Sequence, residues 1–132
     1  MTEYLDNGGR EHIKALDVLT TLPELLTHHL EKRPDAIAYK AWDAKAKAWR
    51  DYSFRFVCEE VERWRHAWAG LGLSRGDRVA MLLPNCMEAV YFDQSVLANA
   101  LVPEPLHAID TPRSSAYILR HSGATLLVTN KK

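Results

Sequence analysis

The sequence has 132 residues, of which 47% are hydrophobic and 26% charged, with 17 basic and 17 acidic side chains and a formal net charge of zero. This composition predicts one folded domain rather than a disordered chain, and the balanced charge argues against a nucleic-acid partner, which would favour a basic surface. No apolar run approaches the roughly 20 residues that span a bilayer, and the polar N-terminus lacks the apolar core of a signal peptide.

The first predicted element is a helix within 21–34. Residues 1–20 show little periodicity, and we expect them to be a mobile lead-in to a folded region over 21–132. Thr21 can cap the helix while Glu24, three residues later, reaches back, as in a capping box. Four leucines share its apolar face: Leu22, Leu25, Leu26 and Leu30. Two short aromatic runs near 36–54 then predict a hairpin.

A longer helix is predicted to begin after Ser53, a favoured N-cap residue, and to stop at Gly70 or Gly72. Its glutamates come early and its arginines late, as the helix dipole prefers. Apolar residues recur at helical spacing along it: Val57, Val61, Trp64, Trp68 and Leu71.

The stretch "LSRGDRVAMLLPN", residues 73–85, raises the question of a phosphate-binding loop. A Walker loop follows a strand and ends in Gly-Lys-Ser/Thr, whereas Gly76 precedes the apolar run and no Gly-Lys follows it. A dinucleotide fingerprint needs three spaced glycines between strand and helix, and none stands there. We therefore interpret Gly76 and Asp77 as a turn that leads into a strand over 78–83, buried on both faces.

The second half of the chain alternates strands and helices. Asn85 and Glu88 predict a second capping box and a helix after it; prolines make 102–107 extended. Thr111 begins another helix that Gly123 ends, and 125–129 is the last strand. The predicted fold class is α/β: a parallel sheet of three strands with flanking helices, and the N-terminal hairpin at the margin of that sheet.

Several segments together resemble the N-terminal region of the AMP-forming adenylating enzymes, a group of acyl-CoA synthetases, luciferases and peptide-synthetase adenylation domains. The most specific are "GLGLSRGDRVAMLLPN", the helix after it, "VPEPLH" and "YILRHSGATLLVT". "YFDQSVLANA" and "PLHAIDTP" are most similar to the long-chain fatty-acyl-CoA synthetase branch. The resemblance covers about Thr21 to Asn130.

This resemblance implies a longer parent enzyme. The parent would convert a fatty acid and ATP, with Mg²⁺ on the phosphates, to an acyl-adenylate and pyrophosphate, and would then transfer the acyl group to coenzyme A. The family's phosphate loop, adenine and ribose motifs and late catalytic lysine lie downstream of the matched region. We therefore expect an N-terminal fragment of the AMP-binding domain that is inactive alone, carries no bound cofactor and self-associates. The residues do not indicate the length of the acyl chain.

The alternative is a non-catalytic, flavodoxin-like α/β binding or interaction module. Such a domain normally has about five parallel strands, and only three are predicted after residue 78, which favours the fragment.

The resemblance also supplies candidate site residues, none of them catalytic. In the resembled fold, Arg113, Arg120 and His121 lie on the side that coenzyme A approaches, where they could contact its phosphates; a solvated helix face is the alternative. His107 ends a strand at the carboxyl side, where open α/β sheets place ligands, and is a candidate for lining the substrate pocket.

Metal and thiol chemistry find no support in the pattern. The histidines show no ligand spacing, and the two cysteines, Cys58 and Cys86, have neither metal-like spacing nor an evident base nearby. We expect reduced thiols in a cytoplasmic protein, which could lie at the inner face of the membrane.

Three residues depart from the family pattern: Glu104, Trp68 and Ala100, the last of which stands where a small glycine is common. Glu104 stands between two prolines where an apolar strand residue is usual; a buried, unpaired carboxylate would cost several kcal/mol, so either Glu104 points to solvent or the sequence is altered there. Trp68 replaces a smaller aliphatic residue, so local packing should differ. The tryptophans could form a base-stacking platform, but core packing is favoured for all four: Trp42, Trp49, Trp64 and Trp68.

Overall fold

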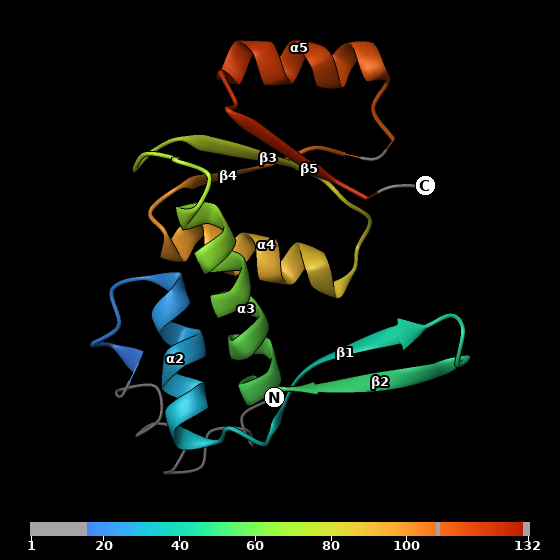
Figure 1. The fold of residues 1–132 in the computed structure, drawn as a ribbon. Coiled ribbons are helices and arrows are strands. Elements are labelled where there is room, and N and C mark those ends of the chain that lie inside the picture. Colours follow the sequence, from blue (N-terminus) through green and yellow to red (C-terminus); the bar gives the residue numbers. More distant parts are fainter. Residues whose placement is uncertain (1–15, 108, 131–132) are drawn as a thin grey trace, which may run out of the picture.

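The computed structural model describes residues 16–107 and 109–130 (Figure 1), so most of the predicted lead-in lies outside the described residues. The elements follow the predicted order: α2 (Leu22–Lys32), β1 (Ile37–Asp43), β2 (Ala48–Ser53), α3 (Phe54–Ala69), β3 (Arg78–Leu82), α4 (Met87–Ala98), β4 (Val102–Pro105), α5 (Pro112–Ser122) and β5 (Leu126–Thr129).

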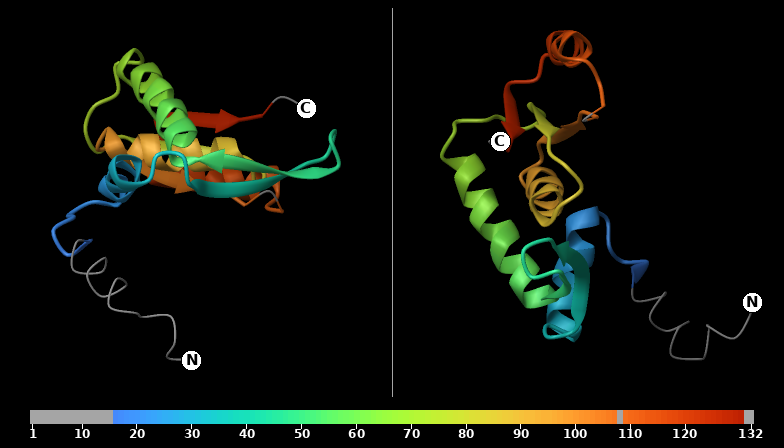
Figure 2. Two further views of the ribbon diagram at one scale, coloured as in Figure 1. Left: turned by 90° about the horizontal axis from the view of Figure 1, so that it is seen from below. Right: turned by 90° about the vertical axis from the view of Figure 1, so that its right-hand side faces the viewer.

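The central sheet has three strands in the order β4-β3-β5, and both pairings are parallel, as predicted. Val79 is in register with Pro103 on one side and with Leu126 on the other. Helix α5 covers one face of the sheet, while α4 and α3 lie on the opposite face (Figure 1; Figure 2, right). Parallel strands need such crossover helices, which is why the alternating pattern predicted this layered arrangement.

The hairpin β1-β2 forms a separate, antiparallel sheet. The expectation that it packs at the margin of the central sheet is wrong: its inner face, with Tyr39 and Tyr52, packs against a cluster that contains Val57 and Val61 of α3. Its far end extends away from the rest of the fold (Figure 2, left). At the turn, the amides of Ala46 and then Lys45 donate to the Asp43 carboxylate and lower its pKa.

The main core lies between the central sheet and the helices on the α4 side. Val79 and Ala80 are adjacent in β3 and both are 0% exposed, so this strand is buried on both faces, as its apolar run predicted. The cluster comprises Trp68, Val79, Phe92, Val96 and Leu101.

Trp68 fits the core because its one polar atom has a partner. Its indole Nε1 donates to Ser95 Oγ at 2.8 Å, and that hydroxyl donates to the Phe92 carbonyl at 3.0 Å. Ser95 is 0% exposed, so this pair satisfies polar groups that burial would otherwise penalise. Core packing is thus confirmed for Trp68, and also for Trp64, whose ring lies edge-on 5.6 Å from that of Trp68.

The prediction of core packing is wrong for the other two tryptophans. Trp42 and Trp49 face each other across the hairpin with ring centroids 5.8 Å apart, and they are 54% and 66% exposed. Paired residues of antiparallel strands lie on the same face of the sheet. No element among the described residues covers the face of the hairpin that carries Trp42 and Trp49. Leu71, predicted on the apolar face of α3, follows the end of that helix and is 56% exposed.

The local capping signals are mostly confirmed. Ser53 and Thr111 accept hydrogen bonds from the amides of Phe56 and Ser114, each at 3.2 Å, and Glu24 reaches back to the Thr21 amide. Asn85 is not a cap: α4 begins one residue later than predicted, at an N-cap Cys86 without a side-chain cap hydrogen bond.

The turn before β3 has the predicted structural role. Asp77 Oδ2 accepts from the Ser74 amide at 2.8 Å, and the Asp77 amide donates back to the Ser74 carbonyl at 2.9 Å. Gly76 between them has φ +87°, a conformation that favours glycine. These residues close a turn at the amino end of β3.

Of the two alternatives stated for Glu104, the structure contradicts the one in which its carboxylate points to solvent. Both carboxylate oxygens are shielded from water, and neither accepts a hydrogen bond from any residue in the described part of the chain. Glu104 is in register with Ala80 of β3, and residues opposite each other in adjacent strands point to the same face. Because Val79 and Met81 face α4, Glu104 points to the α5 side of the sheet.

The N-cap at Ser53 can be tested by substitution. Replacing Ser53 by Ala removes the acceptor for the Phe56 amide and should lower the free energy of unfolding by about 1 kcal/mol, measured by urea denaturation. The Ser53→Asp variant keeps an acceptor and should retain most of the stability. Equal losses in the two variants would contradict the capping role.

Candidate functional site

The carboxyl ends of the three parallel strands define the first candidate site. In open α/β sheets, ligands bind outside this edge. His107 lies there, exposed, two residues after β4, and its carbonyl accepts from the Asp110 amide at 3.0 Å in the turn towards α5. His107 thus lies just past the carboxyl end of β4 rather than within the strand, and its role in lining a substrate pocket stays a prediction.

The candidates on α5 do not gather at one point. Arg113 is in the first turn of the helix, whereas Arg120 and His121 are in the last turn. Arg113 and Arg120 are seven residues apart, which is about 10 Å along a helix axis. All three side chains belong to exposed residues, so one small anion could not contact both ends of the set.

The last turn of α5 is partly held by contacts within the helix. Arg120 Nε donates to the Ala116 carbonyl at 3.1 Å. The His121 ring stacks on Tyr117 with centroids 5.6 Å apart and planes 10° apart. No residue of α5 is buried. This exposure is compatible with a solvated outer face and equally with a face that contacts a ligand.

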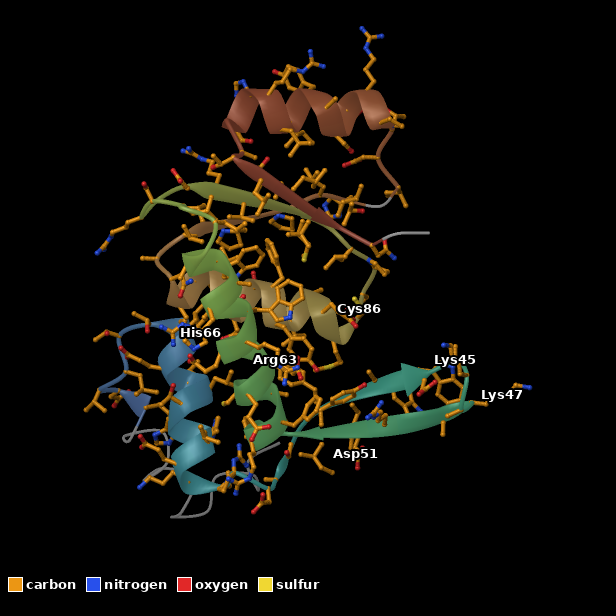
Figure 3. The ribbon with its side chains drawn as sticks, viewed as in Figure 1. Lys45, Lys47, Asp51, Arg63, His66 and Cys86 are labelled. Atoms are coloured by element: carbon orange, nitrogen blue, oxygen red, sulfur yellow. The ribbon has the colours of Figure 1, made fainter. Side chains whose placement is uncertain are left out.

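A second candidate site is a groove that sequence reasoning missed. Its volume is about 1060 Å³, and it lies between the hairpin and the start of α4. Figure 3 shows Cys86 at the end of α4 nearest the hairpin tip, where Lys45 and Lys47 project. Aromatic side chains form much of its lining: Tyr39, Trp42, Trp49, Tyr52, Phe56 and Tyr91. The aromatic runs near 36–54 were the only sequence signal for it.

Three groups of the groove, Tyr39, Tyr91 and the Cys86 thiol, keep their protons near neutral pH. Burial raises the pKa of Tyr91 to about 12, with smaller contributions from Tyr52, Glu60 and Glu88. Burial also raises the pKa of Tyr39 and of the Cys86 thiol. A protonated thiol is a poor nucleophile, so the groove does not suit thiol chemistry. Its lining joins the aromatic rings with charged side chains: Lys40, Asp43, Lys45, Arg50, Glu60 and Glu88.

Thiol and metal chemistry elsewhere are similarly unsupported in the described residues. Burial, followed by the charges of Glu62 and Glu59, raises the pKa of Cys58. Within residues 16–107 and 109–130, no three side chains of His, Cys, Asp or Glu gather where they could share a metal ion. None of the helices described there is long and apolar enough to cross a bilayer.

Comparison with solved structures shows the same fold in two bacterial proteins. The N-terminal subdomain of NpsA from Klebsiella oxytoca, in complex with 3-hydroxybenzoyl-AMSN, superimposes with a TM-score of 0.75 at 20% identity over 86% of this chain and 28% of that chain. O-succinylbenzoate coenzyme A synthetase from Bacillus subtilis gives a TM-score of 0.74 at 22% identity over 86% of this chain and 24% of that one.

Sequence comparison finds further relatives, among them a CoA ligase and a synthase. The crotonobetaine/carnitine–CoA ligase of Salmonella paratyphi B is 33% identical over 81 residues, and naringenin synthase of Pestalotiopsis fici is 31% identical over 115 residues. The chain spans 16% of the length of the first and 4% of the second. A family model described as "AMP-binding enzyme" matches residues 26–132. Because that match covers most of the sequence, the chain belongs to the AMP-binding enzyme family.

Proposed function

We propose that this chain is the N-terminal part of an AMP-forming acyl-CoA synthetase whose acid substrate is a long-chain fatty acid. The whole enzyme would form an acyl-adenylate from the acid and ATP, release pyrophosphate, and pass the acyl group to coenzyme A. The observation that carries this proposal is the family match over 26–132 together with the shared subdomain fold. The long-chain assignment rests on the resemblance of residues 91–100 and 105–112 to that branch.

The proposed role of this chain within the enzyme is structural. A phosphate-binding loop places glycine amides between the carboxyl end of a strand and the next helix. Here Gly76 is in the turn at the opposite, amino end of β3, and the segments 83–86 and 106–111 contain no glycine. These residues do not suit the phosphates of ATP, so we assign ATP, Mg²⁺ and the adenylation step to residues outside this chain.

Coenzyme A is the one cofactor that residues of this chain could contact under the same proposal. Arg113 shares the carboxyl edge of the sheet with His107, and a guanidinium suits a phosphate group. Arg120 and His121 lie about 10 Å further along α5 and would reach only a different part of an extended ligand. We therefore place the phosphate contact at Arg113 and the substrate contact at His107.

The flavodoxin-like alternative has one observation in its favour. The strand order β4-β3-β5 corresponds to the first three strands of the flavodoxin-like order 2-1-3-4-5. A binding module of that type would work as it stands. The family match favours the enzyme part, and an exchange assay of the complete product of the coding region separates the two possibilities, because only the enzyme would be active.

The 132-residue chain should show no fatty-acid-dependent exchange of pyrophosphate into ATP, because the proposal places the phosphate-binding residues elsewhere. A related full-length synthetase, assayed in parallel, is the positive control. Exchange above a no-protein blank would overturn the structural role. The complete product of the coding region should be tested with acids of increasing chain length; a preference for short or aromatic acids would contradict the long-chain assignment.

A further inference from the structure

We draw no further inference here: the strongest candidate, the aromatic-lined groove between the hairpin β1-β2 and the start of α4, is a surface of a chain that spans only part of its relatives' length, and nothing in the structure shows what covers it.

Discussion

Replacing Trp68 by Ala should lower the free energy of unfolding by about 3–5 kcal/mol, the usual cost of deleting a buried aromatic ring from a core. Trp68 is 5% exposed and packs among Val79, Phe92 and Val96 of the main core. Small domains are stable by only about 5–15 kcal/mol, so this variant should lose most of its cooperative unfolding transition in urea.

Two further variants separate packing from hydrogen bonding at this position. Trp68→Phe keeps much of the ring volume but removes the donor to Ser95, and a double-mutant cycle with Ser95→Ala should give a coupling of about 1 kcal/mol. Trp49→Ala, at a residue 66% exposed on the hairpin, should cost far less than Trp68→Ala. Similar losses at Trp49 and Trp68 would contradict the assignment of the core.

Replacing Glu104 by Val should raise the free energy of unfolding by about 2 kcal/mol. The two carboxylate oxygens are shielded from water without a hydrogen-bond partner among the described residues, and an unsatisfied buried polar group costs about 1–3 kcal/mol. Valine also suits a strand position, here one in register with Ala80. The measurement is the shift in the urea midpoint at constant slope.

The control variants distinguish charge from hydrogen bonding at Glu104. Glu104→Gln removes the charge but leaves an unsatisfied amide, so its gain should be smaller than that of Glu104→Val. Glu59→Gln alters an exposed residue of α3 and should leave stability nearly unchanged. A destabilised Glu104→Val would show that the carboxylate has a favourable partner, and the burial argument would fail.

Features that depend on near neighbours in the chain were predictable. The order and type of the helices and strands follow from hydrophobic periodicity, and the caps at Ser53 and Thr111 follow from side chains that bond amides three residues away. The turn at Gly76 follows in the same way from local backbone preference. The resemblance that implied the family also rests on segments of contiguous sequence.

Features that depend on which surfaces meet were not predictable. Trp49 and Trp68 are the same residue type and each follows an alanine, yet one is exposed and the other buried. The reason is that α3 packs against the central sheet, whereas no described element covers the face of the hairpin that carries Trp49. The groove beside Cys86 joins residues from the hairpin, α3 and α4, and no local pattern indicates that these segments are adjacent.

The sequence by itself determined the α/β class, the element order and the turn before β3, since these follow from local backbone preference and periodic burial. Only the tertiary structure decided that Glu104 is shielded and that the hairpin packs against α3 rather than at the margin of the central sheet. These outcomes depend on register and packing between residues distant in the chain, and a shift of one residue in register would turn the Glu104 side chain to the other face of the sheet.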